Sequence, residues 1–129
     1  MGMYTELYIS CELKELPNDV ENVLNALFGD GNFDELDTLP DHSFFTCPRW
    51  TMVGGCSSYY FTPFALSKLH RDHTGTLYLT SRSDLKNYHG EIKGFLDWIM
   101  PYIDACEGDH LGHFRYEEEE TPTFIFYKG

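Results

Sequence analysis

Residues 5–14, TELYISCELK, alternate between apolar and polar side chains, and this pattern restricts the fold more than any other stretch of the chain. Successive side chains of a β-strand point to opposite faces, so a period of two predicts a strand with one buried face. Such a strand needs neighbouring strands and a covering layer, which predicts a sheet with helices packed on it. The apolar positions are Leu7, Ile9, Cys11 and Leu13.

Two other stretches repeat their apolar residues at the spacing of an α-helix. The first spans residues 17–28, with Pro17 near its start and Gly29 directly after it. The second lies within residues 87–105, where Asn87 is suited to cap the first turn and Pro101 ends or kinks the last. The apolar positions are Val20, Val23, Leu24, Leu27 and Phe28 in the first helix and Ile92, Phe95, Leu96, Ile99 and Ile103 in the second.

The middle of the chain is rich in aromatic residues and threonine, which is typical of strands. We expect strands near residues 57–64 and 74–83, with a turn over residues 73–75, and a shorter strand within residues 44–53. Acidic residues, glycine and proline without a sustained period predict a surface loop over residues 29–43.

The last fifteen residues, RYEEEETPTFIFYKG, place four consecutive glutamates directly before an apolar segment. Alternation puts Ile125 and Tyr127 on one face of a final strand and Phe124 and Phe126 on the other. A strand that is apolar on both faces predicts a position inside the sheet or beneath a helix. The glutamates are too costly to bury unpaired, so we expect them in a charged turn at one edge of the sheet.

The order of these elements predicts one α+β domain over residues 3–129. The length of 129 residues is typical of a single domain with its own core. The expected order is β-α-β-β-β-α-β-β, a mainly antiparallel sheet with two helices packed on one face. A ferredoxin-like variant is the alternative topology. Met1 and Gly2 are interpreted as a cloning remnant in front of Met3.

The chain is strongly acidic, with a formal net charge of −12 and an isoelectric point near 4.7. Residues 1–41 hold ten acidic side chains against one basic, and residues 104–129 hold seven against two. Residues 42–103, in contrast, hold four acidic side chains against six basic ones. Repulsion argues against direct binding to nucleic acid or to an anionic membrane, so the expected partner is a basic protein.

No stretch approaches the roughly 20 apolar residues of a membrane-spanning helix, and the first residues lack an export signal. These features predict a cytoplasmic protein. The cysteines are scattered without a Cys-x-x-Cys pair, so we expect reduced, mostly buried thiols and no disulfide bond. They are Cys11, Cys47, Cys56 and Cys106.

Three groups of residues have some features of a metal site, and each group lacks a feature that the site requires. Two histidines three positions apart point to opposite faces if both lie in one strand. The calcium-like run lacks the glycine and the final glutamate of an EF-hand loop. We therefore expect no metal and no cofactor. The groups are His110 and His113 with Cys106 and Asp109, His70 with His73, and Asp30 with Asn32 and Asp34.

Asp41, His42 and Cys47 are the residue types of a nucleophilic triad, yet neighbours in sequence rarely form one. Since no nucleophile elbow, P-loop or dinucleotide motif is present, no catalytic residue is assigned. A small hydrolase that uses Cys47 and His42 or a bound metal stays an alternative. A further alternative is a protein that sequesters a small molecule or nucleotide in an aromatic pocket. The pocket candidates are Arg49, Trp50, Tyr59 and Tyr60.

Four stretches carry a resemblance to a known family: MYTELYISCELKELPNDVENVLNALF, DHSFFTCPRW, SSYYF and SDLKNYHGEIKGFLDWIMPYIDACEGDHLGHFRYEEEETPTFIFY. They resemble small uncharacterised proteins of phages, prophages and other mobile elements of bacteria, and the likeness covers nearly the whole chain from Met3. It implies the context of a mobile element, in which inhibitors and sequestering proteins are common. It implies no activity and no functional residue.

The leading hypothesis is a non-enzymatic interaction protein that engages a basic protein through an acidic surface, as an inhibitor or by mimicry of a nucleic acid. It rests on the distribution of charge and on the lack of a catalytic motif. We expect the acidic surface to combine the glutamate run with the acidic loop after the first helix. Its residues are Glu117, Glu118, Glu119, Glu120, Asp34, Glu35 and Asp37.

Overall fold

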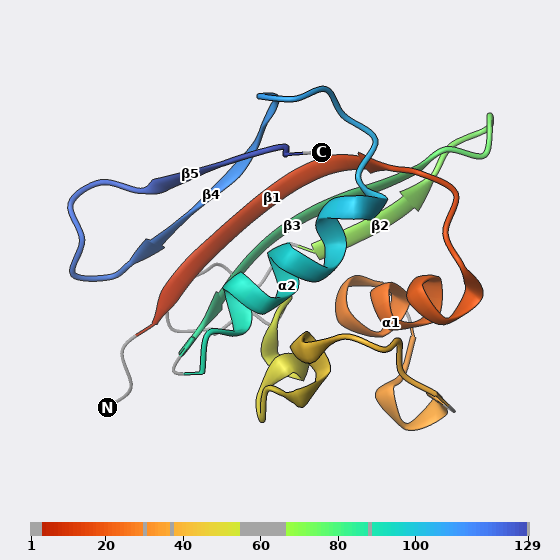
Figure 1. Cartoon of the computed structure of the whole chain (residues 1–129), viewed down its shortest axis with the longest axis horizontal. Coiled ribbons are helices and arrows are strands. Elements are labelled where there is room, and N and C mark those ends of the chain that lie inside the picture. Colours follow the sequence, from red (N-terminus) through yellow and green to blue (C-terminus); the bar gives the residue numbers. More distant parts are fainter. Residues whose placement is uncertain (1–3, 30, 37, 55–66, 88, 129) are drawn as a thin grey trace.

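Figure 1 shows the computed structural model of the chain, which describes residues 4–29, 31–36, 38–54, 67–87 and 89–128. These residues form five β-strands, two α-helices and several short 3₁₀-helices. The strands and α-helices are β1 (Thr5–Leu13), α1 (Asn18–Phe28), β2 (Ser67–Arg71), β3 (Leu77–Leu85), α2 (Glu91–Ile99), β4 (His110–Tyr116) and β5 (Thr123–Phe126).

The strands form one antiparallel sheet in the order β2-β3-β1-β4-β5. Strands β1 and β2, which are linked through α1, therefore run parallel on either side of β3. Strands β3 and β4, which are linked through α2, flank β1 in the same way. Two interlocked β-α-β units of this kind give the ferredoxin-like connectivity, to which β5 is added beside β4. The predicted α+β class and antiparallel sheet are confirmed.

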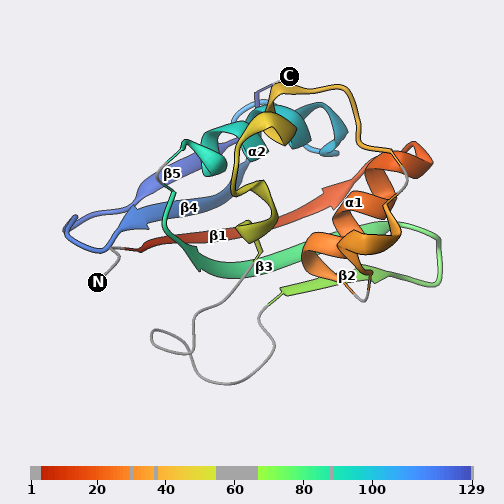
Figure 2. The ribbon, with the colours of Figure 1, turned by 90° about the horizontal axis from the view of Figure 1, so that it is seen from below.

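The hydrophobic core lies between one face of the sheet and the two helices. Leu7 and Ile9 of β1 are fully buried, as the period of two predicts. They belong to the same cluster as Val23 of α1 and Phe95 of α2. Figure 2 shows α2 lying along one side of the sheet. Both helices thus pack on the face that carries the apolar side chains of β1, where each buried leucine or isoleucine contributes about 1.5–3 kcal/mol.

The start of α2 is stabilised by side chains on both sides of the helix boundary. The Asn87 side-chain oxygen accepts a hydrogen bond from the Ile92 N–H at 3.0 Å, so it bonds to the first turn as predicted, although the N-cap position is occupied by Gly90. The Glu91 carboxylate, which is buried, accepts from the His89 N–H at 2.7 Å. At the other end, Pro101 lies in a single 3₁₀ turn, Met100–Tyr102, that ends the helical segment.

The predicted strand within residues 44–53 is wrong. Two 3₁₀-helices, Ser43–Thr46 and Trp50–Met52, occupy this segment. Phe44 is fully buried there, with ring contacts to Phe95 and Trp98 of α2 at centroid distances of 5.9 and 5.7 Å. Packing of aromatic rings against α2, and not pairing with another strand, therefore decides the backbone conformation of this segment.

The strand pair β2–β3 is only partly as predicted. The turn over residues 73–75 and a strand that overlaps residues 74–83 are confirmed, since β3 begins at Leu77. Strand β2 was not predicted, because SKLHR contains one apolar residue and shows no clear alternation. The strand expected near residues 57–64 lies outside the described residues.

The predicted interior position of the final strand is also wrong. β5 lies at the edge of the sheet and pairs only with β4 among the described strands. Ile125 is 5% exposed and Tyr127 is 9% exposed, so the face toward the helices is buried as expected. Phe124 and Phe126 on the opposite face are 56% and 45% exposed, because no helix covers that face in the described part of the chain.

Candidate functional site

The glutamates of residues 117–120 occupy a turn whose backbone is fixed by three hydrogen bonds. The Glu117 N–H donates to the Tyr4 carbonyl at 3.1 Å, and the Glu119 N–H donates to the Tyr116 carbonyl at 2.9 Å. The Arg115 guanidinium donates to the Glu119 carbonyl at 2.6 Å. Since Glu118 and the two glutamates after it are exposed, this part of the chain holds negative charge in a defined position.

Two phenylalanines of β5 stand on the open face of the sheet directly beyond this turn. His110 of β4 packs its ring against Phe124 and Phe126 at centroid distances of 5.5 and 5.7 Å. His110 pairs with Phe126 across the strands, and His113 pairs with Phe124. The three rings of His110 and the phenylalanines form an exposed apolar strip, in which aromatic contact area is available to a partner.

A β-bulge explains why His110 and His113 share this face. The register of β4 against β5 shifts between His110 and Gly112, so Leu111 is an extra residue. The expectation that the two histidines point to opposite faces is therefore wrong. His113 stacks on Tyr8 of β1 at 5.6 Å, which extends the line of rings toward the centre of the sheet.

We name these features together the hairpin surface. It combines fixed negative charge, exposed aromatic rings and the outer edge of β5, where a strand at the end of a sheet leaves backbone donors and acceptors for another chain. An arrangement of this kind is suited to binding an extended polypeptide. The hairpin surface consists of Glu118, Glu119, Glu120, His110, Phe124, Phe126 and the outer edge of β5.

The structure does not bring the two predicted acidic segments together. Asp34 and Glu35 lie in a 3₁₀-helix, Phe33–Glu35, whose start is capped by the Asn32 side chain. This helix and the turn of residues 117–120 lie at opposite ends of the molecule's long axis in Figure 1. Asp37 is outside the described residues. The acidic turn therefore has to be considered without the acidic loop.

The predicted aromatic pocket is only half described. Trp50 is partly buried and packs its ring against Phe33, Phe44 and Phe45 at centroid distances of 5.6, 5.9 and 5.0 Å. Arg49 directly precedes it, at the start of the 3₁₀-helix Trp50–Met52. Tyr59 and Tyr60 are outside the described residues, so this alternative stays a prediction. The contacts of Trp50 are those of a core residue.

The candidate triad residues make separate contacts. The His42 Nδ1 accepts the Phe44 N–H at 3.0 Å and so caps a 3₁₀-helix. The Cys47 thiol points to the His89 carbonyl at a sulfur–oxygen distance of 3.7 Å. Asp41 is exposed. Neither of these contacts joins the cysteine to the histidine, as activation of a thiol nucleophile would require.

The described cysteines are free thiols, and they are less buried than expected. Cys106 is exposed, which corrects the expectation of mostly buried thiols, and Cys11 and Cys47 are partly buried. Burial raises the pKa of the Cys11 thiol to about 12, so this thiol stays protonated and unreactive at neutral pH. Within the described ranges, no three side chains of histidine, cysteine, aspartate or glutamate converge as a metal site.

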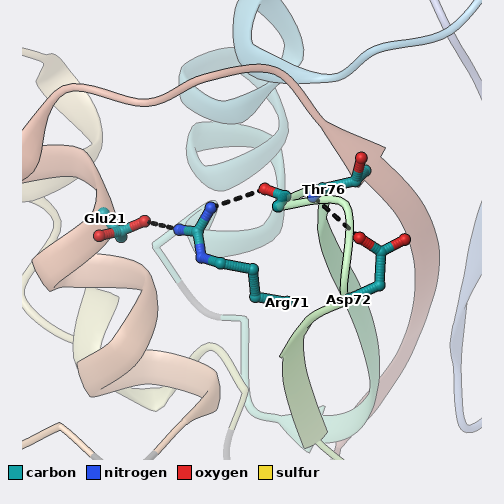
Figure 3. Close-up of polar contacts among 5 residues, drawn as sticks. Glu21, Arg71, Asp72 and Thr76 are labelled. Carbon is teal, nitrogen blue, oxygen red and sulfur yellow. Dashed lines mark hydrogen bonds and ion pairs between the residues drawn. The ribbon is translucent and has the colours of Figure 1, made fainter.

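A polar groove of about 490 Å³ lies between the end of β1, the start of α1 and the β2–β3 turn. Arg71 crosses it: the guanidinium forms an ion pair with Glu21 of α1 and donates to the Gly75 carbonyl at 2.8 Å (Figure 3). The two charged side chains are 51% and 33% exposed, and an exposed pair of this kind contributes at most about 1 kcal/mol. We assign Arg71 the structural role of joining α1 to the turn.

Asp72 organises the same turn, and its removal gives a pH-dependent prediction. Its carboxylate accepts from the Thr74 hydroxyl, the Thr74 N–H and the Thr76 N–H at 2.6, 2.9 and 3.0 Å. The bond from the Thr74 hydroxyl, followed by those from the two N–H groups, lowers the pKa of Asp72 below its ordinary value of 3.8. A lowered folded-state pKa stabilises the fold above pH 3.8, and this stabilisation is lost as the pH falls through the folded value.

We therefore expect Asp72→Ala to lower Tm at neutral pH, and the difference from the unmodified protein to shrink as the pH falls below 4. Thermal unfolding followed by circular dichroism from about pH 7 to pH 2 measures this difference in Tm. Asp72→Asn keeps the acceptor oxygen, so its Tm deficit should be smaller. A deficit in Asp72→Ala that is independent of pH would contradict the assigned role of the carboxylate.

No protein-family model, curated protein or solved structure matches the chain in the three comparisons made. Within the described residues, no helix has the length and apolar character needed to cross a membrane. The candidate site therefore depends on the geometry and charge of the hairpin surface alone.

Sequence reasoning found half of this surface. The glutamate run is plain in the sequence, and its placement in a turn between two strands is confirmed. Phe124 and Phe126 were grouped on one face, but that face was assigned to the interior. The length of β5, only 4 residues, is typical of a strand at a sheet edge, but this length is known only from the structure.

Proposed function

We propose that the protein is a non-enzymatic interaction protein that binds an extended, basic segment of a partner protein along β5. The observation that carries the proposal is the position of β5 at the sheet edge, with two exposed phenylalanines beside a fixed run of glutamates. Strand addition of this kind uses the backbone for affinity and alternate side chains for specificity.

Charge complementarity supports a basic partner over other occupants. The chain carries a net charge of −12, and the glutamates of residues 117–120 directly precede β5. Lysine or arginine side chains at one end of an added strand would meet these carboxylates, while the next positions would lie over Phe124 and Phe126. Aromatic contacts are frequent in binding hot spots, and complementary charges steer the encounter of two proteins.

The same charge argues against a nucleic acid on this surface, because each phosphate would be repelled. A partner that itself binds nucleic acid through a basic segment fits the surface well, and binding would then block that segment. The resemblance to proteins of mobile elements is in keeping with such an inhibitor, as is a reducing, cytoplasmic setting for the exposed Cys106 thiol.

The proposal is tested with three short fluorescent peptides and fluorescence anisotropy. The first alternates arginine with valine, the second alternates glutamate with valine, and the third is the basic peptide with a central proline. We expect only the first to bind, because the second is repelled and the third cannot continue a strand. Binding should weaken between about 0.01 M and 0.15 M salt, as the Debye length falls from about 30 to 8 Å.

Matched variants locate the site. Glu118→Gln with Glu119→Gln should weaken binding about 2- to 30-fold, if each exposed ion pair contributes about 0.2–1 kcal/mol. Asp34→Asn with Glu35→Gln removes the same charge at the far end of the molecule and should have little effect. Equal loss in both variants, or equal binding of the proline peptide, would overturn strand addition at β5. A dimer without peptide in sedimentation would instead assign the β5 edge to a second copy.

A further inference from the structure

The two ends of β5 differ in charge. The glutamates of residues 117–120 precede the strand, and Arg115 at the end of β4 donates to a carbonyl of their turn. At the other end, the exposed Lys128 follows β5, and the exposed Glu107 and Asp109 precede β4. Four glutamates and one arginine give a formal charge of −3 at the start of β5, whereas one lysine, one glutamate and one aspartate give −1 at its end.

The backbone of β5 directs the polar groups of its two phenylalanines to the outer edge of the sheet. The Tyr127 N–H donates to the Asp109 carbonyl at 2.8 Å, and the Gly108 N–H donates to the Tyr127 carbonyl at 3.0 Å. Tyr127 thus uses both of its backbone groups toward the β4 side. Because successive residues of an extended chain direct these groups to opposite sides, those of Phe126 and Phe124 are directed away from β4. No described strand pairs with this outer edge.

An added strand that runs antiparallel to β5 makes the best use of these groups. In an antiparallel pair, a residue opposite Phe126 or Phe124 can exchange both hydrogen bonds with it, and such pairing is slightly more stable per residue than parallel pairing. Every strand pairing of the described sheet is antiparallel as well. The side chains opposite the two phenylalanines would lie on the open face of the sheet, beside the exposed rings.

We propose that the partner segment runs antiparallel to β5 and carries its basic residues toward its own C-terminal end. In this direction, the C-terminal half of the segment lies beside the start of β5, where residues 117–120 supply the negative charge. Its N-terminal half lies beside Lys128. Two apolar residues, two positions apart, precede the basic ones and lie opposite Phe126 and then Phe124. This inference rests on the proposed function and adds the direction of the segment and the order of its residues.

A segment with the reverse order of residues fits less well in either direction. If it runs antiparallel to β5, its basic residues lie beside Lys128 and the less negative end of the strand. If it runs parallel to β5, its basic residues reach the glutamates, but the backbone pairing is the less stable one. Charge and backbone pairing therefore favour the same direction only for the segment that we propose.

The test is a pair of peptides that contain the same residues in opposite order. Both are blocked as N-acetyl amides, so that terminal charges do not contribute. The forward peptide begins with alternating threonine and valine and ends with arginines, and the reverse peptide begins with the arginines. Titrations followed in ¹H–¹⁵N NMR spectra give both dissociation constants. We expect the forward peptide to bind about 2- to 30-fold more tightly, the range for two exposed ion pairs.

Matched variants assign this preference to the ends of β5. Glu118→Gln with Glu119→Gln should remove most of the preference, because the formal charges at the two ends then become equal. Lys128→Gln should strengthen binding of the reverse peptide by up to about 5-fold and leave the forward peptide nearly unchanged. Asp34→Asn with Glu35→Gln, the control at the far end of the molecule, should keep the full preference.

A nitroxide label on the forward peptide reports its direction. At the C-terminus of the peptide, the label should broaden the amide signals of residues 118–120, and at the N-terminus it should broaden that of Lys128. A C-terminal label that broadens Lys128 instead, or equal affinities of the two peptides, would overturn the direction and leave strand addition at β5 intact. Binding of neither peptide would overturn the proposed function and this inference together.

Discussion

Replacing Phe44 by alanine will lower the free energy of unfolding by about 3–5 kcal/mol, the range for a buried phenylalanine. Phe44 is fully buried although it lies in a 3₁₀-helix between α1 and β2, and its ring contacts Phe95 and Trp98 of α2. Gly94 brings α2 close to this ring, since a Cβ at Gly94 would lie 3.1 Å from the Phe44 Cδ1. Phe44 therefore joins the irregular segment to the second helix.

The loss should appear as a fall in Tm of about 10–20 °C for a chain of this size. Urea unfolding followed by tryptophan fluorescence gives the free energy, because Trp50 and Trp98 are both neighbours of Phe44. Phe124→Ala is the matched control: it removes the same side chain from an exposed position and should change stability by less than about 0.5 kcal/mol. It should instead weaken binding of the basic strand peptide.

These two phenylalanine variants separate a core role from a binding role. If Phe44→Ala costs no more than Phe124→Ala, the aromatic cluster over α2 is not part of the core. If Phe124→Ala unfolds the protein, the open face of β5 is covered in solution and the hairpin surface is not available. Either result would contradict the arrangement described above.

Gly112→Ala will destabilise the protein by about 3 kcal/mol or more, at the upper end of the cost of overpacking. A Cβ at this position would lie 1.9 Å from the Tyr8 carbonyl oxygen and 2.9 Å from the Ile9 Cα. Both are backbone atoms of β1, which cannot move without breaking its pairing with β4. Gly112 pairs with Ile9 of β1 and lies next to the bulge at Leu111, where the register of β4 against β5 shifts.

Gly75→Ala in the β2–β3 turn is the control for this variant. No atom lies within 4 Å of the added Cβ, and its φ of +89° costs only the strain of a left-handed conformation, about 1–2 kcal/mol. Urea unfolding of both variants decides the comparison. Equal costs would show that β1 and β4 are not packed as closely as described, and the position of the hairpin surface would then be in doubt.

Periodicity predicted the elements that bury only one face. β1, α1 and α2 each bury a single face, so their apolar positions recur at a period of two or 3.6 and reveal both type and orientation. Residues 44–53 contain the aromatic residues and threonine of a strand, but their conformation depends on α2, which lies far away in sequence. Local propensity carries no information on such a contact.

The candidate site likewise has one part that the local sequence predicts and another that depends on distant contacts. The acidic turn is determined locally, and its position between two strands was predictable. Whether a strand with two apolar faces lies at the centre or at the edge depends on which strands pair, and this is decided by the whole chain. The shared face of His110 and His113 follows from one extra residue at Leu111, for which Gly112 beside it is only a weak signal in the sequence.

The position of β1 in the sheet also affects how the protein folds during its synthesis on the ribosome. Thr5 pairs with Leu85 on one side and with Tyr116 on the other, so β1, which is synthesised before both partner strands, finds its neighbours only much later. Until then its leucines and isoleucine are open to chaperones and to other nascent chains. Because most of these pairings span long stretches of chain, we expect folding on the millisecond-to-second scale, mostly after synthesis has passed β4.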